Sequence, residues 1–90
     1  MPFYVYIIQS SIDGSYYKGF TKNLRSRIMT HNEKGSRYTS AKAPWHFVYL
    51  EELPDKRTAL QREKTLKKFS HAQIKALIKS TRNCLSSWII

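Results

Sequence analysis

Two short runs of β-branched and aromatic residues, separated by a turn signal, constrain the fold of this chain most strongly. The first run covers residues 3–9 and the second covers residues 16–20, and Asp13-Gly14 between them is typical of a tight turn. Two such runs joined by such a turn predict a β-hairpin near the start of the chain.

The alternation within the first run predicts a hairpin with two chemically different faces. Successive side chains of a strand point to opposite sides, so Tyr4 and Tyr6 should share one face, while Val5 and Ile7 take the other. We expect Tyr17, in the second run, to meet Tyr6 across the hairpin. An aliphatic face opposite a tyrosine-bearing face is therefore predicted.

The rest of the sequence predicts three helices and one further strand. In chain order these are a helix capped by Thr21 or Asn23 that ends at about Asn32, a strand at residues 46–53, a helix from Asp55 or Thr58 to about Phe69, and a helix opened by the capping box Ser70-x-x-Gln73. The order β-β-α-β-α-α predicts an α+β fold in which helices flank a small three-stranded antiparallel sheet. Ninety residues make one domain, with its core at about residues 3–80 and a C-terminal tail at 81–90.

The charge of the chain is strongly positive and unevenly distributed. Sixteen Lys and Arg residues against six Asp and Glu give a net charge of +10. All of the basic residues lie within 18–42 and 56–82, and each segment holds one acidic residue. A solvated helical face that keeps the protein in solution would explain one such cluster. Two clusters without balancing acids favour contact with a polyanion, and nucleic acid is the first candidate.

Cysteine content and hydropathy indicate in which cellular compartment the protein is expected. Cys84 is the only cysteine, so no intramolecular disulfide and no cysteine-based metal site can form. No segment approaches the ~20 apolar residues that span a bilayer, and the N-terminus has no signal-peptide pattern. These features predict a cytoplasmic protein with no membrane partner.

Five residues together supply what metal-assisted phosphodiester cleavage requires: Tyr6, Tyr17, Arg27, His31 and Glu63. A phenol can hold or deprotonate a water, an arginine can neutralise phosphate charge, a histidine can relay a proton and a carboxylate can hold a divalent cation. Arg27 and His31 are four residues apart and so lie on one side of the predicted helix. Taken singly, each residue has an ordinary explanation as a strand tyrosine or a surface pair.

Glu63 is the least ordinary of the five. Ala59, Leu60 and Leu66 lie at helical spacing from it, which places Glu63 on the inward side of its helix. A buried carboxylate must be paired or must bind a metal. Pairing would involve Lys67 or an arginine at the edge of the core. A single carboxylate is a weak metal site by itself. Magnesium is nevertheless a candidate, because it often uses one protein carboxylate together with waters and substrate phosphates.

The spacing of these residues resembles that of a known family. The triplet Tyr4-Val5-Tyr6 is followed about ten residues later by Tyr17-Lys18-Gly19, then by Arg27, His31 and, on a later helix, Glu63. This pattern resembles the GIY-YIG nuclease family, above all its small stand-alone bacterial branch, and the resemblance covers about residues 3–78. The chain departs from the triplets at Tyr4, where the family has glycine, and at Lys18, where it has isoleucine.

The resemblance implies a metal-dependent endonuclease that hydrolyses phosphodiester bonds of DNA, with a role in repair or recombination. It implies that Tyr6 is the general base, that Tyr17 positions the water and that Arg27 stabilises the phosphate in the transition state. His31 would assist proton transfer, and Glu63 would hold one Mg²⁺ or Mn²⁺ ion.

Basic and aromatic residues outside this set are candidates for nucleic-acid contact. They are Lys18, Lys22, Arg25, Lys34, Arg37, Tyr38 and Lys67. DNA is favoured over RNA, and a separate protein partner could supply specificity, because little of the chain lies outside the predicted catalytic domain. The alternative is a basic nucleic-acid-binding module on the same fold that cuts weakly or not at all.

Overall fold

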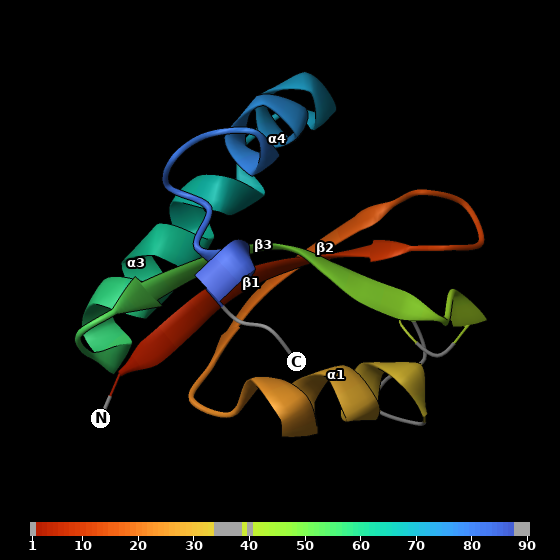
Figure 1. Ribbon diagram of the computed structural model, residues 1–90, viewed down its shortest axis with the longest axis horizontal. Coiled ribbons are helices and arrows are strands. Elements are labelled where there is room, and N and C mark those ends of the chain that lie inside the picture. Colours follow the sequence, from red (N-terminus) through yellow and green to blue (C-terminus); the bar gives the residue numbers. More distant parts are fainter. Residues whose placement is uncertain (1, 34–38, 40, 88–90) are drawn as a thin grey trace.

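A three-stranded antiparallel sheet with helices on both faces forms the centre of the molecule (Figure 1). The computed structural model describes residues 2–33, 39 and 41–87. The strands β1 (Phe3–Ser10), β2 (Tyr16–Thr21) and β3 (Trp45–Leu53) lie in the order β2-β1-β3. The helices are α1 (Leu24–Asn32), α3 (Lys56–Lys67) and α4 (His71–Ile78), followed by a short 3₁₀ helix, η1 (Leu85–Ser87). The predicted α+β class and the three-stranded sheet are confirmed.

The hairpin forms where the turn signal predicts it. Gly14 has a positive φ of 76°, a conformation that glycine adopts without steric cost. The Gly14 N–H donates to Ser10 O at 3.0 Å and closes the turn. Strand β1 lies in the middle of the sheet, paired with β2 on one side and β3 on the other, which leaves β2 as an edge strand.

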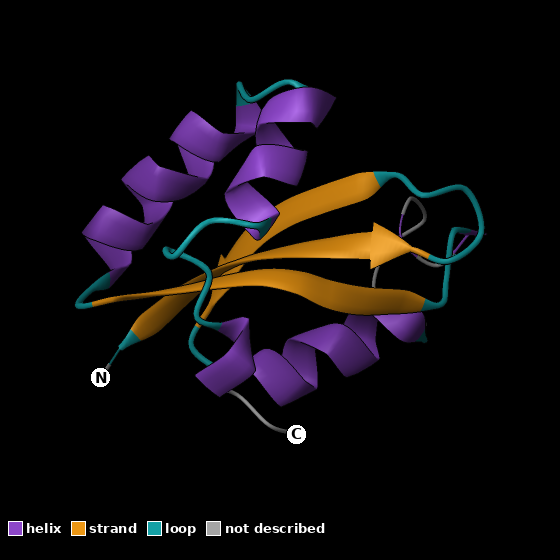
Figure 2. Cartoon of the chain, turned by 45° about the horizontal axis from the view of Figure 1, so that its top comes forward, coloured by secondary structure: helices purple, strands orange, loops and turns teal. Residues whose placement is uncertain are grey.

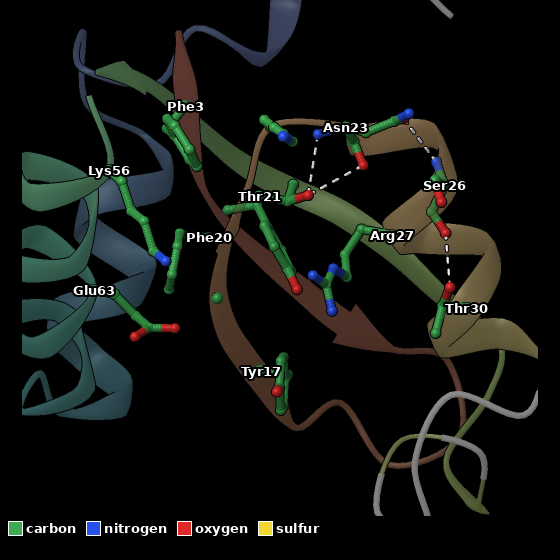
Figure 3. Close-up of a pocket in the computed structure, with 13 residues that line it drawn as sticks. Phe3, Tyr17, Phe20, Thr21, Asn23, Ser26, Arg27, Thr30, Lys56 and Glu63 are labelled. Atoms are coloured by element: carbon green, nitrogen blue, oxygen red, sulfur yellow. Dashed lines mark hydrogen bonds between the residues drawn. The ribbon is translucent and has the colours of Figure 1, made fainter. Parts of the chain in front are cut away.

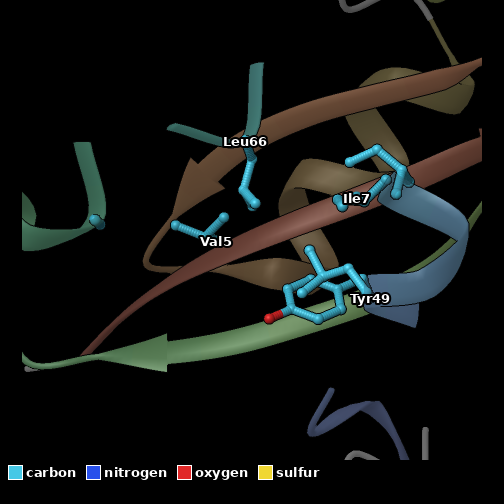
Figure 4. Packing of buried hydrophobic residues seen from close by; sticks show 7 residues of the cluster. Val5, Ile7, Tyr49 and Leu66 are labelled. Atoms are coloured by element: carbon cyan, nitrogen blue, oxygen red, sulfur yellow. The ribbon is translucent and has the colours of Figure 1, made fainter. Parts of the chain in front are cut away.

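One face of the sheet is aliphatic and is covered by α3 and α4 (Figure 2). Val5 and Ile7 of β1 are fully buried there together with Tyr49 of β3. Leu66 of α3 packs over them, and Figure 4 shows these four side chains in one cluster. The predicted alternation along β1 therefore places its aliphatic residues as expected.

The opposite face carries the tyrosines and is covered by α1. Tyr4 and Tyr6 are buried there with Leu24 of α1 and Trp45 of β3. The Asn32 side chain, at the end of α1, is hydrogen-bonded to both the backbone N–H and the carbonyl of Trp45. This pairing fixes α1 against the start of β3.

The helix starts follow the capping signals in the sequence. Asn23 caps α1 by accepting a hydrogen bond from Ser26 N, and Asp55 caps α3 by accepting one from Thr58 N. Ser70 opens α4 with both hydrogen bonds of a capping box. Helix α3 ends at Lys67, two residues before the expected end at Phe69, and β3 begins at Trp45, one residue earlier than expected.

Asn83 fastens the end of the described chain to the sheet. Its side-chain amide donates to the carbonyls of Val48 and Ile78, and its side-chain oxygen accepts the N–H of Leu50 and Leu85. Such a side chain replaces backbone pairing at an edge that has no neighbouring strand. Among the described residues, no helix has the length and apolar character that crossing a membrane requires.

Candidate active site

A cleft of about 820 Å³ opens at the edge of β2, between α1 on one side and α3 on the other (Figure 3). Side chains from both faces of the sheet reach it. Its lining comprises Phe3, Tyr6, Tyr17, Gly19, Phe20, Thr21, Lys22, Asn23, Ser26, Arg27, Thr30, Lys56 and Glu63. Four of the five residues singled out from the sequence are in this set, and the fifth, His31, lies directly behind Tyr6.

Gly19 is the reason that Tyr6 reaches the cleft. These two residues are direct partners in the β1–β2 ladder, whereas Tyr17 lies opposite Ile8. Tyr6 and Tyr17 therefore share one face of the hairpin, as expected, but as diagonal rather than direct neighbours, and both rings lie against the His31 ring. A Cβ atom on Gly19 would lie 2.5 Å from the Tyr6 hydroxyl oxygen and 2.7 Å from Cζ. The absence of a side chain leaves the room in which the phenol sits.

Tyr6 and His31 form a buried hydrogen-bonded pair. The Tyr6 hydroxyl and His31 Nε2 are 2.8 Å apart, and both residues are almost inaccessible to solvent. Burial raises the pKa of Tyr6 well above its ordinary value of 10.0, and the positive charge of Arg27 opposes this only in part. Burial also lowers the pKa of His31 from 6.5, and Arg27 lowers it further. Both side chains are therefore neutral at neutral pH.

The second ring nitrogen of His31 has no such partner. His31 Nδ1 is buried and makes no hydrogen bond within the part of the chain that the structure describes. The imidazole can therefore exchange a proton through Nε2 with Tyr6 and with no other described side chain. That arrangement differs from a structural histidine held at both nitrogens, and it suits a relay.

Arg27 and Tyr17 complete the α1 side of the cleft. Arg27 is exposed and forms no ion pair with any described residue, so its guanidinium is available to an anion in the cleft. The Tyr17 ring is half-buried and lies 4.8 Å from the His31 ring, centroid to centroid. A guanidinium beside a phenol and a phenol–imidazole pair is an arrangement that can bind and polarise a phosphate.

Glu63 faces the same space from α3. Its side chain is 13% exposed, and Lys67 Nζ lies 3.7 Å from its carboxylate. Lys67 is 57% exposed, so this pair is weak and solvent-screened. The sequence also left open a pair with an arginine at the edge of the core. No described arginine forms an ion pair with Glu63, and the neighbouring Arg62 is bound to Glu51, its Nε donating to Oε1 at 3.0 Å.

The engagement of Arg62 by β3 leaves the charge of Glu63 available to the cleft. The same Glu51 oxygen also accepts the hydroxyl of buried Tyr49 at 2.7 Å. Glu51, Tyr49 and Arg62 thus form a closed network on the aliphatic face. Arg62 and Glu63, although adjacent on α3, consequently have separate partners, and of these two only Glu63 lines the cleft.

The residues present fit a weakly held hard cation rather than a preformed metal cage. Among the described residues, Glu63 is the only acidic residue that lines the cleft, and these residues contain no cluster of three or more His, Cys, Asp or Glu side chains suited to a metal. Mg²⁺ retains several waters and commonly uses one or two carboxylates together with substrate phosphates. One carboxylate in a cleft that accepts a phosphate meets that requirement.

The predicted nucleic-acid contacts divide into three groups. Lys22 lines the cleft. Three others do not line the cleft: Lys18, Arg25 and Lys67. Lys18 follows the strand alternation to the face of β2 opposite that of Gly19, and Arg25 lies on another part of α1. Lys67 pairs with Glu63. The remaining three, Lys34, Arg37 and Tyr38, are outside the described residues.

Sequence reasoning missed Lys56, Phe3 and Phe20, all of which line the cleft. Lys56 is the first residue of α3 and precedes Glu63 by seven positions. Seven residues are about two helical turns, so the two side chains lie on the same side of the helix. The seven-residue spacing from Glu63 could therefore have indicated from the sequence that Lys56 lies near the site.

Comparisons with known proteins identify the family of this chain. The family described as "GIY-YIG catalytic domain" matches residues 2–75. The chain belongs to the GIY-YIG family. It is 45% identical over 69 residues to a UPF0213 protein of Bacillus cereus, which covers 76% of this chain and 71% of that protein. A UPF0213 protein of Staphylococcus haemolyticus is 44% identical over 71 residues, covering 78% of this chain and 85% of the relative.

A solved structure shares the fold. The solution NMR structure of a UPF0213 protein from Bacillus halodurans superposes with a TM-score of 0.59 and 31% sequence identity, covering 94% of this chain and 90% of that one. The similarity to the small GIY-YIG proteins therefore extends over nearly the whole chain.

Proposed function

We propose that this protein is a metal-dependent endonuclease that hydrolyses phosphodiester bonds of DNA. The observation that carries the proposal is the buried Tyr6–His31 pair beside the Arg27 guanidinium, which forms no ion pair with any described residue, in a cleft that also contains Glu63. Membership of the GIY-YIG family, whose nucleases generally use a divalent metal, supports it. The net charge of +10 supports an anionic polymer as substrate.

Tyr6 acts as the general base through His31. Because the pKa of Tyr6 is raised, it is not a phenolate in the resting protein and cannot by itself remove a proton from water. It accepts the proton of the attacking water as its own proton passes to Nε2 of His31. The lowered pKa of His31 keeps that nitrogen unprotonated and able to accept at neutral pH.

The other residues of the site bind the phosphate and the metal ion and orient the attacking water. Arg27 neutralises the charge that develops on the phosphate, and Tyr17 positions the attacking water. Glu63 would hold one Mg²⁺ or Mn²⁺ ion, which supplies Lewis-acid stabilisation of the departing oxygen when bound. Lys22 contacts the nucleic-acid backbone, and a separate protein partner supplies sequence or structure specificity.

A nucleic-acid-binding module without cleavage is the second candidate. The observation that favours it is the combination of high positive charge with a single carboxylate in the cleft, rather than a ready-made metal cage. Both candidates predict salt-sensitive DNA binding, in which the logarithm of affinity falls linearly with the logarithm of salt concentration. Only the nuclease requires Glu63 for a chemical step.

The substitution Glu63→Gln separates the two. In Mg²⁺ or Mn²⁺, supercoiled plasmid or branched DNA should be nicked by the wild type and not by Glu63→Gln, while DNA binding stays equal or becomes slightly tighter as a negative charge is lost. Glu52→Gln, which changes an exposed glutamate of β3, is the matched control and should nick normally. Equal nicking by wild type and Glu63→Gln would remove Glu63 from the site.

A thermal melt of Glu63→Gln completes this experiment. If the role of Glu63 is structural, its loss should lower the stability by about 1–3 kcal/mol, and neither protein should cut. If DNA is bound but never cut by the wild type with any divalent metal, the binding module is the correct function.

A further inference from the structure

Lys56 is a cleft residue to which neither the motif nor the proposed chemistry gives a role. It is exposed, lines the cleft and makes no ion pair with any residue that the structure describes. The adjacent Asp55 carboxylate is occupied as the helix cap, accepting Thr58 N at 2.8 Å. Figure 3 shows Lys56 and Glu63 extending from the same helix toward β2.

The spacing along α3 separates Lys56 from the carboxylate. Seven residues correspond to about 10.5 Å of helix rise, and the two side chains lie on one side of the helix. Duplex DNA advances about 3.4 Å per nucleotide, so this rise equals about three nucleotides of one strand. If the cleaved phosphate lies beside Glu63 and Arg27, the Lys56 ammonium is within reach of a different phosphate of the same strand.

The surroundings of Lys56 favour an anion. Lys22 lines the same cleft, and Phe3 and Phe20 form an apolar part of its wall, with ring centroids 6.3 Å apart. Cleft walls of low dielectric strengthen the attraction between a cation and a phosphate. Glu63 is the only acidic residue among the described residues that line the cleft.

We propose that Lys56, assisted by Lys22, forms a second phosphate-binding subsite that holds a phosphate of the same strand about three nucleotides from the one being cut. This inference rests on the proposed nuclease function for the position of the cut. Lys56 contributes to DNA binding and fixes the register of the bound strand in the cleft. Lys56 contacts the substrate but takes no part in proton transfer.

The test compares Lys56→Ala with Lys68→Ala and Lys56→Arg. Lys68 is an exposed lysine at the end of the same helix that does not line the cleft, so its substitution removes the same charge elsewhere. Affinity for a duplex oligonucleotide is measured in EDTA over a range of salt concentrations, so that no cleavage occurs. Each lost phosphate contact lowers the salt slope by about 0.9.

The expected result is a slope lower by about one for Lys56→Ala, with no change for Lys68→Ala and Lys56→Arg. The affinity ratio of wild type to Lys56→Ala should then shrink about threefold between about 50 and 200 mM salt. If Lys56→Ala and Lys68→Ala have the same salt slope, whether or not that slope differs from the wild-type slope, the proposed subsite is contradicted.

Nicking kinetics in Mg²⁺ or Mn²⁺ separate failure of the subsite from failure of the nuclease. Lys56→Ala should raise KM and leave kcat nearly unchanged, because the contact is equally strong in the ground and transition states. A wild type that never nicks but shows the Lys56-specific loss of slope would retain the phosphate subsite and contradict the nuclease. A wild type that nicks, with Lys56→Ala indistinguishable from Lys68→Ala, would retain the nuclease and contradict the subsite.

Discussion

The two faces of the sheet are built from the same three strands but differ in chemistry. The face under α3 and α4 is largely aliphatic, and its buried polar groups, the Tyr49 hydroxyl among them, are satisfied in a closed network with Glu51 and Arg62. The face under α1 buries tyrosines and His31, one of whose ring nitrogens has no partner among the described residues. Satisfied groups contribute to stability, whereas an incompletely paired titratable group is available for chemistry.

At the edge strand β2, side chains from the two sides of the sheet meet in one cleft. Gly19 removes a side chain from the edge, so Tyr6 of the α1 face and Glu63 of the α3 side line one cleft. Substitutions on the aliphatic face should therefore change stability, whereas substitutions on the cleft side should change reaction rate. The three predictions below test that division, from the largest expected effect to the smallest.

Leu66→Ala should lower stability by about 2–5 kcal/mol, because it opens a cavity in the fully buried aliphatic cluster. Chemical denaturation measures this loss. Leu60→Ala, on the same helix but 36% exposed, is the control and should cost much less. Well below the melting temperature, nicking per folded molecule should be unchanged by Leu66→Ala. A parallel loss of rate would show that the two faces are not separable.

Arg27→Ala should reduce nicking by about 10²–10³-fold, because the guanidinium acts on charge that develops in the transition state. The melting temperature should be nearly unchanged, since Arg27 is exposed and pairs with no described residue. Arg25→Ala, on the same helix but outside the cleft, should nick almost normally. A loss of DNA affinity equal to the loss of rate would make Arg27 an ordinary backbone contact.

The pH dependence of stability should report the burial of His31. Because the folded protein disfavours the imidazolium, the pKa of His31 is lowered, and the unfolded chain binds the proton more readily. This contribution to stability is complete above about pH 6.5 and is lost as the pH falls below that value. His31→Gln should therefore lose less stability than wild type on acidification, as measured by thermal melts. His46→Gln, which changes an exposed histidine, is the matched control variant.

Local patterns predicted the frame of the fold correctly. The strand alternation assigned Tyr6 and Val5 to opposite faces, because side-chain direction in a strand follows from backbone geometry alone. The capping residues Asn23 and Ser70 marked the helix starts, because the hydrogen bonds of a cap are made within a few residues.

Features that depend on how distant elements pack were not predictable from the sequence. The register that pairs Tyr6 with Gly19 depends on the geometry of the hairpin turn, and a shift of two residues leaves the alternation unchanged. Which lysine lines the cleft depends on where α3 lies over the sheet. Lys56 therefore escaped detection, and Lys18 was included although it points to the other face.

The central claim is that residues from the two sides of the sheet act as one site. Nicking rates of Tyr6→Phe, Glu63→Gln and the double variant, measured with the same plasmid and metal concentration, test it most directly. Residues that act as a unit have strongly non-additive effects, so the double variant should be no slower than the slower single variant. If the two rate losses multiply, or if either single variant nicks like the wild type, Tyr6 and Glu63 do not belong to a common catalytic site.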